Sequence, residues 1–268
     1  MQELLMSPIA YLLTALSLTI TMSTQTALAS SSSYYDNNTE YELTQGSKRD
    51  KELRGYLRHV ANRNFRPLGY KKRSKKILFG NLHLDKESDG SYFIKGVYCD
   101  FMVRDHIGPK KIPINNVMNT EHTWPQSKGA KREPARGDLH HLFPTNSSAN
   151  SARGNHPFGE VDGKDATRDC PQSQRGDIIN PNTGKPTNTY GFQPHPEHRG
   201  NVARAMFYVS AKYGYDIPKL EEYYLRKWHK EDPVDQEERE RNDGIEEAQG
   251  NRNPFIDFPE IVERMENL

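Results

Sequence analysis

The sequence is poor in apolar residues and almost balanced in charge. Apolar residues make up 34% of the 268 positions and charged residues 27%, which excludes a polytopic membrane protein and predicts long polar loops around a modest core. The 37 Lys and Arg residues face 36 Asp and Glu residues. This near-zero balance excludes a uniformly basic protein that coats DNA, but it allows a locally basic face.

Cysteine is nearly absent, since the chain has only Cys99 and Cys170. Two cysteines are too few for a disulfide-rich scaffold, and neither has a second cysteine at ligand spacing, so a zinc finger is unsupported. In an oxidising compartment the two could pair. The sequence leaves a disulfide and a pair of free thiols equally open.

A long uncharged run occurs only at the start of the chain. No charged residue lies between Leu4 and Tyr35, and the apolar stretch at 9–20 is followed by the small-x-small pattern Ala27-Leu28-Ala29, which is typical of a cleaved signal peptide. Glu3 and the lack of an early Lys or Arg are atypical of such a leader. A membrane anchor is the alternative, although the stretch is short of the ~20 residues that a span needs.

We therefore predict a signal peptide at 1–29, a flexible segment at 30–47 and one domain at 48–268. The mature protein is expected to be secreted or periplasmic, without stable membrane association. The two cysteines are compatible with that location.

The charge is distributed unevenly along the chain. Residues 48–76 hold 12 Lys or Arg against 2 acids, a balance of +10, whereas residues 219–266 hold 8 against 15, a balance of −7. Both runs can be solvated helical faces. The basic run can instead bind a polyanion such as nucleic acid.

Hydrophobic spacing predicts mainly helices. Leu53, Leu57 and Val60 share one face of a helix at 49–63. The absence of a βαβ rhythm indicates an α+β fold in a single domain. The other expected elements are a helix at 70–80, a strand at 92–103, a loop at 104–118, little regular structure at 124–198, and helices from Arg199, at 218–230 and at 234–248.

The residues with the most chemistry lie between 119 and 160. Glu121 and His122 are adjacent, so they point to opposite faces within a strand but can converge where a strand ends. A carboxylate is a hard ligand for Mg²⁺ or Ca²⁺, and an imidazole can take a proton from water. The amide oxygen of Asn150 could complete a sparse oxygen site. These residue types alone are only weak evidence for metal catalysis.

Three blocks strengthen that interpretation: EHTWPQS at 121–127, DLHHLFP at 138–144 and NSARGNHPFGE at 150–160. In this order they resemble the endonuclease I family, exported bacterial nucleases of the ββα-metal, or His-Me finger, class. RGNVARAMFY at 199–208 and AQGNRNPF at 248–255 resemble the family's later segments. The resemblance covers about 50–265.

The resemblance implies a mechanism. His122 would be the general base, and Glu121 and Asn150 would hold one Mg²⁺, with Mn²⁺ or Ca²⁺ as substitutes. A two-stranded hairpin would carry the first two residues and a following helix the third. The expected protein is a monomeric, sequence-non-specific endonuclease that leaves 5′-phosphate and 3′-hydroxyl ends on DNA, with RNA left open as a second substrate.

The family also implies an arginine near the scissile phosphate. Lys131, Arg132 and Arg136 compete for this role, and we favour Arg132. Arg153 is a further candidate for phosphate contact, although a structural ion pair is an equal possibility. Asp138 and His140 are expected to brace the finger, as supports of the metal site or as turn packing.

Three other classes were considered. A nucleic-acid-binding module without catalysis would use the basic run but would not require Glu121, His122 and Asn150 together. A glycosidase needs two converging acids, for which only Glu160 and Asp162 stand out. A zinc hydrolase needs histidines at helical spacing, which Pro196 disfavours between His195 and His198.

Overall fold

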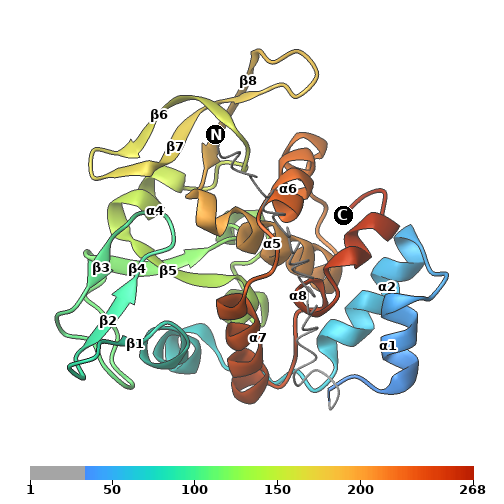
Figure 1. The fold of residues 1–268 in the computed structure, drawn as a ribbon, viewed down its shortest axis with the longest axis horizontal. Helices are drawn as coiled ribbons and strands as arrows, with labels where there is room; N and C mark the ends of the chain where they lie inside the picture. Colours follow the sequence, from blue (N-terminus) through green and yellow to red (C-terminus); the bar gives the residue numbers. More distant parts are fainter. Residues whose placement is uncertain (1–33) are drawn as a thin grey trace, which may run out of the picture. The chain divides into compact units, whose positions relative to one another are not determined.

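Helix α5 (Arg199–Tyr213) is a buried helix on which several other helices pack. The computed structural model describes residues 34–268, so the predicted signal peptide at 1–29 lies outside the described residues. Twelve of the fifteen α5 residues are buried, and α2, α6 and α8 contact the helix (Figure 1). Small residues such as Ala203, Ala205 and Ala211 let neighbouring elements approach it closely.

The predicted helices at 49–63, at 70–80, from Arg199, at 218–230 and at 234–248 are all present, and the structure adds α1, α8 and η8, which the sequence pattern did not predict. The basic segment at 70–82 is helical as expected but consists of two π-helical turns around a short α-helix. The α- and π-helical elements are α1 (Asn37–Thr44), α2 (Asp50–Asn62), η2 (Tyr70–Ser74), α3 (Lys75–Ile77), η3 (Leu78–Leu82), α4 (Ser147–Arg153), α5, α6 (Lys219–Glu231), α7 (Gln236–Gln249) and α8 (Pro254–Asp257). Short 3-10 helices are η4 (Gln126–Lys128), η5 (Ala135–Gly137), η6 (Leu139–His141), η7 (Pro196–His198) and η8 (Pro259–Arg264).

Helix α1 corrects the expectation that 30–47 is flexible. The carboxylate of Asp36 accepts a hydrogen bond from the Thr39 amide at 2.8 Å and so caps the helix. Leu43 is fully buried, and Arg264 donates to the carbonyls of Glu42 and Leu43. The sequence did not predict this helix because one buried leucine and a contact with a distant arginine produce no helical pattern of apolar residues.

All strand pairs in the described chain are antiparallel. Only the two ends of the predicted strand at 92–103 pair as strands, because residues 96–101 leave the sheet to bury Tyr98 and Cys99. The three sheets contain β1 (Asp85–Lys86), β2 (Tyr92–Lys95) and β3 (Met102–Val103); β4 (Met118–His122) and β5 (Leu142–Asn146); and β6 (Val161–Thr167), β7 (Cys170–Ile179) and β8 (Pro186–Gln193).

The expectation of little regular structure at 124–198 is wrong. The segment contains β5, α4 and the whole β6–β7–β8 sheet. Strands β6 and β8 are largely exposed, and all three strands are rich in polar residues and glycine, so their sequences lack the apolar–polar alternation that marks a half-buried strand. Gly163 and Gly176 are paired, and a Cβ on Gly163 would lie 2.1 Å from the Arg175 carbonyl oxygen. Glycine is therefore required where the strands are closest.

Cys99 and Cys170 form a disulfide. It joins the β2–β3 connection to the first residue of β7, and the Ser173 hydroxyl next to it donates to the Tyr98 carbonyl at 2.7 Å. Of the two possibilities that the sequence left open, the structure shows the disulfide. No helix among residues 34–268 is long and apolar enough to cross a membrane.

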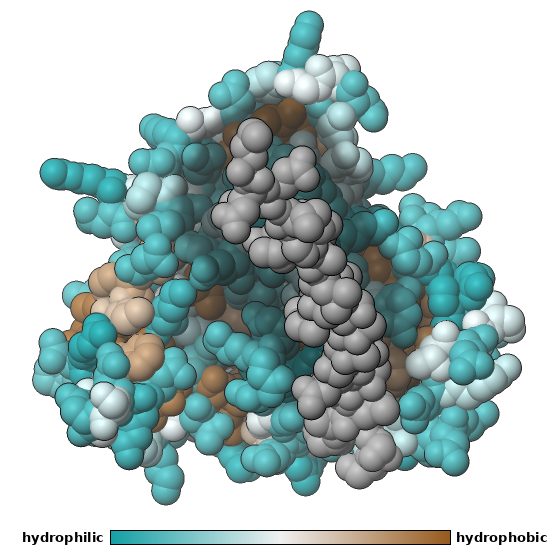
Figure 2. All heavy atoms as spheres, viewed as in Figure 1, coloured by the Kyte–Doolittle hydropathy of each residue, from teal (hydrophilic) through white to brown (hydrophobic). Residues whose placement is uncertain are grey.

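The described surface is polar, as the composition predicts. On the face drawn in Figure 2, hydrophilic residues predominate and the hydrophobic patches are small and scattered. The core cluster beside the finger is correspondingly small and joins η3, β2, β5 and α7 through residues such as Phe79, Ile94, Leu142 and Ile245. Polar contacts therefore carry much of the internal order.

The most connected of these polar contacts centre on Asp138, which precedes the short turn η6 (Leu139–His141). Its fully buried carboxylate accepts hydrogen bonds from Lys212 at 2.8 Å, Tyr208 at 2.9 Å and Tyr213 at 2.7 Å, all on α5. Gln249, the last residue of α7, donates to the other oxygen at 2.8 Å. One carboxylate thus fixes the start of the β5 segment to two helices.

His140 adds a second contact from the same turn. Its Nε2 lies 3.1 Å from the Asn251 carbonyl oxygen, and its ring packs on Tyr208 with 4.5 Å between the ring centroids.

Burial alone would raise the pKa of Asp138, but the Lys212 ammonium and the donors around the carboxylate hold that pKa well below its usual range. The carboxylate is therefore ionised in the folded protein.

We predict that Asp138→Asn lowers the free energy of unfolding by about 3–5 kcal/mol, because it leaves the buried Lys212 ammonium without a counter-charge. Urea denaturation followed by circular dichroism measures the change. Asp162→Asn on the exposed strand β6 is the control and should stay within about 0.5 kcal/mol of the parent. Equal stability of the two variants would show that Asp138 is not a structural centre.

Candidate active site

The hairpin β4–β5 and helix α4 form the predicted strand–strand–helix unit. Glu121 pairs with Phe143 and His122 with Leu142 across the hairpin. The Asn146 side chain accepts hydrogen bonds from the amides of Ser148 and Ala149 at 2.9 and 3.1 Å, so α4 begins directly after β5. The helix therefore lies against the hairpin and carries Asn150 to it.

An open cleft lies on this unit. Glu121, His122 and Asn150 all line it, together with Thr120, Pro125, Gln126, Ser127, Arg153, Gly154 and Asn155. Because β4 ends at His122, the chain turns there, and the adjacent Glu121 and His122 side chains both reach the cleft. The structure therefore brings together the three residues that the sequence selected.

Glu121 is held in place by two partners. It is 1% exposed; its Oε1 accepts a hydrogen bond from the Tyr98 hydroxyl at 2.9 Å and lies 3.4 Å from the Arg153 guanidinium. Burial raises the pKa of Glu121, while Arg153 and Tyr98 oppose the rise. No group among residues 34–268 donates a hydrogen bond to its Oε2, which leaves that oxygen free to act as a ligand.

Asn150 is oriented by its amide nitrogen. Nδ2 donates to the Asn119 side-chain oxygen at 2.6 Å and to the Thr120 carbonyl at 3.1 Å. Asn119 is fixed in turn, because its own amide donates to Ser147 at 2.9 Å. The Asn150 Oδ1 accepts no hydrogen bond from the described part of the chain. Two residues of the cleft lining therefore each offer an oxygen without a partner in the described chain, one charged and one neutral.

This donor set fits a hydrated Mg²⁺, which usually binds through one or two protein oxygens and keeps several waters. Within residues 34–268, no group of three or more His, Cys, Asp or Glu side chains is arranged to hold a metal. An all-protein cage is thus not formed in that part of the chain. A Glu and Asn pair with open positions is the arrangement that the sequence analysis expects.

His122 has a defined tautomer. Its Nε2 lies 3.0 Å from the carbonyl oxygen of Arg136, and since a carbonyl only accepts, Nε2 carries the proton. Nδ1 then carries the lone pair and accepts a hydrogen bond from the Gln126 side-chain amide at 3.4 Å. Burial, and next the neighbouring His141, lower the pKa of His122 to about 3. The ring is therefore neutral at pH 7, as a general base must be.

Tyr70 also belongs to this site, although the sequence did not predict it. Its ring packs against His122 with 4.9 Å between the centroids. The Arg136 guanidinium lies 4.9 Å and the Lys75 ammonium 5.4 Å from the centre of the same ring. The end of the basic run therefore lies beside the finger. In the sequence, the net charge of +10 at residues 48–76 suggested that this segment binds a polyanion, but it did not identify Tyr70.

The structure separates the arginine candidates. Arg132 is exposed and does not line the cleft, so the structure does not bring it to Glu121 and His122. Arg136 is nearer, because its carbonyl contacts His122 and its side chain covers Tyr70. Lys131 is exposed and also lies outside the cleft lining.

Arg153 is 1% exposed and has structural partners. Besides Glu121, it donates to the carbonyls of Thr123 at 2.7 Å, Gly154 at 3.2 Å and His122 at 3.4 Å. These bonds support a structural role for Arg153 rather than a role in phosphate contact. They fix the chain where it turns after β4, and so they position both Glu121 and His122.

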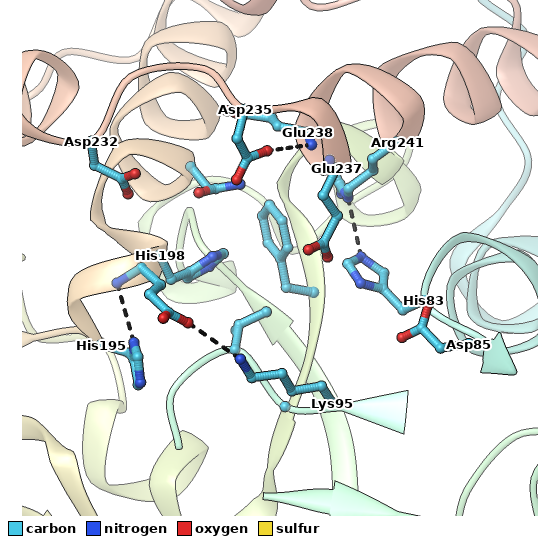
Figure 3. A pocket seen from close by; sticks show the side chains of 15 residues that line it. His83, Asp85, Lys95, His195, His198, Asp232, Asp235, Glu237, Glu238 and Arg241 are labelled. Carbon is cyan, nitrogen blue, oxygen red and sulfur yellow. Dashed lines mark hydrogen bonds and ion pairs between the residues drawn. The ribbon is translucent and has the colours of Figure 1, made fainter. Parts of the chain in front are cut away.

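The other histidine pair lies elsewhere. His195 and His198 line a separate cavity that does not include Glu121, His122 or Asn150 (Figure 3). The nearest acid to His195 is Asp100, at 3.4 Å from its Nε2. The arrangement gives no support to a zinc hydrolase in the described chain.

Sequence comparison decides the family. The sequence profile of endonuclease I matches residues 51–260. The chain belongs to the endonuclease I family. This confirms the resemblance drawn from the three sequence blocks and gives the strand–strand–helix unit a family context.

Curated relatives of this family member are nucleases. An extracellular ribonuclease of Bacillus subtilis (strain 168) is 35% identical over 168 residues, covering 55% of this chain and 53% of the relative. An extracellular ribonuclease of Bacillus amyloliquefaciens is 36% identical over 167 residues, with the same two shares. A periplasmic deoxyribonuclease of Aeromonas hydrophila is 31% identical over 137 residues, covering 48% and 51%. The chain spans about half the length of the curated relatives it matches.

We predict that Arg153→Ala lowers the free energy of unfolding by about 3–5 kcal/mol, because it leaves the buried Glu121 carboxylate without its counter-charge. Chemical denaturation measures the loss. Arg175→Ala on β7, an arginine of the neighbouring sheet with no such ion pair, is the control. If Arg153→Ala is as stable as the parent but binds nucleic acid more weakly, the phosphate-contact role is the correct one.

Proposed function

We propose that this chain is a Mg²⁺-dependent, sequence-non-specific endonuclease that hydrolyses phosphodiester bonds and leaves 5′-phosphate and 3′-hydroxyl ends. The observation that carries the proposal is the convergence of Glu121, His122 and Asn150 on one open cleft of the strand–strand–helix unit. Membership of the endonuclease I family supports it.

In this mechanism the protein supplies a base and an oxygen site. The Nδ1 atom of His122 takes the proton of the attacking water, and the Arg136 carbonyl and the Tyr70 ring keep the imidazole aimed at the cleft. A pKa of about 3 makes His122 a weak base, and the negative charge of a bound phosphate would raise that pKa. Glu121 and Asn150 would hold the metal ion, which when bound would stabilise negative charge on the phosphate and the leaving oxygen.

We propose that the protein binds nucleic acid through its backbone phosphates, because contacts to phosphates carry no sequence information and so allow cleavage at any sequence. Lys71, Arg73 and Lys76 are exposed on the basic segment that ends beside Tyr70, and Arg136 is the arginine nearest to His122. By contrast, cations earlier in the basic run have structural partners: Arg54 donates to the Tyr215 carbonyl and pairs with Asp216. The phosphate-binding part is therefore the end of the run.

The substrate is proposed to be DNA, RNA or both. The names of the relatives divide between ribonucleases and deoxyribonucleases, and nothing in the cleft selects between the sugars. The relatives' extracellular and periplasmic locations, together with the disulfide, support an exported protein. We propose that it acts there as a monomer.

We predict that His122→Ala lowers the cleavage rate by about 10²–10⁴-fold, the usual contribution of a general base, while nucleic acid binding is kept. Plasmid and single-stranded RNA digestion in Mg²⁺ buffer measure the rate, and a gel shift in Ca²⁺ measures binding. His59→Ala, on the exposed face of α2, is the control and should cleave like the parent. If His122→Ala keeps more than about a tenth of the parent's cleavage rate, His122 is not the general base.

The same assay with EDTA tests the second candidate function, a nucleic-acid-binding module without catalysis. The parent protein should degrade both substrates with Mg²⁺ and neither with EDTA. Binding without cleavage under every metal condition would support the module instead.

We predict that Glu121→Ala and Asn150→Ala each weaken Mn²⁺ binding at least tenfold by isothermal titration, because each removes one of two protein ligands. Asn188→Ala, on the exposed face of β8, is the matched amide control. An unchanged isotherm for Asn150→Ala would remove Asn150 from the metal site. Glu121→Gln keeps the shape of the side chain and separates lost charge from lost packing around Arg153.

We predict that replacing Lys71 and Arg73 with Ala makes the salt dependence of duplex DNA affinity shallower by up to about 2 log units per log unit of salt, because each phosphate contact contributes about −0.9 to the slope. The measurement uses the His122→Ala background at constant Mg²⁺. Lys51→Ala/Arg239→Ala removes two exposed cations away from the cleft and should leave the slope unchanged. Equal slopes in the two double variants would show that the basic run is a solvated face that does not contact phosphate.

A further inference from the structure

A cavity adjoins the catalytic cleft on the segment that follows β4. Its volume is about 430 Å³, which is the size of a small-molecule site. Pro125 lines both the cavity and the cleft, and the short turn η4 contributes Ser127 to the cleft and Lys128 to the cavity. One part of a molecule that is bound in the cleft can therefore enter this cavity.

Much of the cavity wall is apolar. The residues of this kind in the wall are Trp124, Pro125, Met206, Tyr215 and Pro218. The rings of Trp124 and Tyr215 pack on each other with 5.3 Å between their centroids. The Trp124 ring nitrogen donates to the Lys128 carbonyl at 2.8 Å, and the Tyr215 hydroxyl donates to the Gly129 carbonyl at 3.2 Å. Because the polar atoms of both rings are already paired, the rings offer the cavity apolar surface.

One buried carboxylate lines the same cavity. Glu221, in the first turn of α6, is 3% exposed, and its Oε1 accepts a hydrogen bond from the Phe158 backbone amide at 2.8 Å. Its Oε2 has no hydrogen-bond partner among residues 34–268 and is not sealed from solvent. A buried carboxylate oxygen is costly unless a donor reaches it. The cavity therefore favours a ligand that brings an N–H group to Glu221.

The other charged groups of the cavity do not fill this role. Lys128 is exposed, and its ammonium makes no hydrogen bond or ion pair within the described chain. Asp216 already pairs with an arginine of α2 at 3.0 Å. Burial raises the pKa of Glu221, and the Phe158 amide, followed by Lys128 and Arg153, opposes the rise. One free acceptor and one free cation thus lie beside an apolar wall.

We propose that this cavity receives an unpaired nucleobase of the strand that is bound in the catalytic cleft, with a base N–H donating to Glu221 Oε2 and the flat base against Trp124 and Tyr215. The inference rests on the proposed nuclease function. Every nucleobase has an N–H donor and two apolar faces, so the cavity accepts any sequence. A second phosphate does not fit, because the Glu221 carboxylate would repel it.

The proposal implies a preference for single strands. In a duplex the bases are stacked and their Watson–Crick donors are paired, whereas an unpaired base can leave the strand and pack on aromatic side chains. The cavity therefore adds to the affinity for single-stranded RNA or DNA, while the phosphate contacts act on single strands and duplexes alike.

Fluorescence anisotropy on the full His122→Ala chain with Ca²⁺ tests the proposal. The two ligands are a single-stranded DNA octamer and an octamer of tetrahydrofuran abasic units, which has the same phosphates but no bases. We expect the abasic octamer to bind at least about tenfold more weakly, because contacts between one base and aromatic side chains typically contribute that much. A protein that contacts only the backbone binds both octamers equally.

Glu221→Gln in the same background separates base binding from general electrostatics. The new amide oxygen can still accept from the Phe158 amide, but the other end of the side chain then presents N–H groups to the cavity. We expect the DNA octamer to bind about fivefold or more weakly, and the abasic octamer at least as tightly as before, because a negative charge is lost. If Glu221 acts only through its charge, both octamers bind more tightly. Circular dichroism checks the fold.

The matched control is Glu231→Gln, which changes an exposed carboxylate of α6 outside both the cavity and the cleft and should bind both octamers like the His122→Ala protein. Equal binding of the two octamers would overturn the proposal, and that comparison needs no change at Glu221. Unchanged or tighter binding of the DNA octamer by Glu221→Gln would also overturn it. If the parent cleaves nucleic acid but the octamers bind equally, only this proposal fails; if neither octamer binds, the proposed function fails with it.

Discussion

The buried carboxylate of Asp138 is the contact on which the geometry of this protein depends most. It balances the charge of the Lys212 ammonium and accepts hydrogen bonds from two tyrosine hydroxyls of α5. It also accepts a hydrogen bond from the side chain of Gln249, the last residue of α7. A buried charge is tolerated only when it is paired and hydrogen-bonded. Because the chain passes from Asp138 through η6 directly into β5, this one group fixes the hairpin against the helical layer.

The catalytic geometry follows from that anchoring through a short chain of contacts. Across the hairpin, β5 fixes the register of β4, and Arg153 fixes the turn after β4 by binding the carbonyls of His122 and Thr123. Tyr98, whose carbonyl accepts from Ser173 beside the disulfide, holds the Glu121 carboxylate. The site is thus held rigidly by the protein, and Glu121, His122 and Asn150 all line its open cleft, which is the preorganisation that electrostatic catalysis requires.

The sequence predicted local motifs better than long-range contacts. Helical spacing located α2, α5, α6 and α7, and the resemblance to the endonuclease I family implied that Glu121, His122 and Asn150 meet on a hairpin and the helix that follows it, which is a local unit. It failed for β6–β8, whose polar sequences lack apolar–polar alternation, and for α1, which depends on a contact with the distant Arg264. It also missed Tyr70 and could not place Arg132 or Arg136, since a residue's distance from a cleft is a tertiary property that no short pattern encodes.

The most direct test of the account is the position of a metal ion in crystals of the His122→Ala protein grown with Mn²⁺ and a short nucleic acid, located by anomalous scattering. The account predicts one strong peak about 2.0–2.3 Å from both Glu121 Oε2 and Asn150 Oδ1, next to a phosphate oxygen. A peak that lies away from these two oxygens, or a bound nucleic acid with no metal in the cleft, would contradict it.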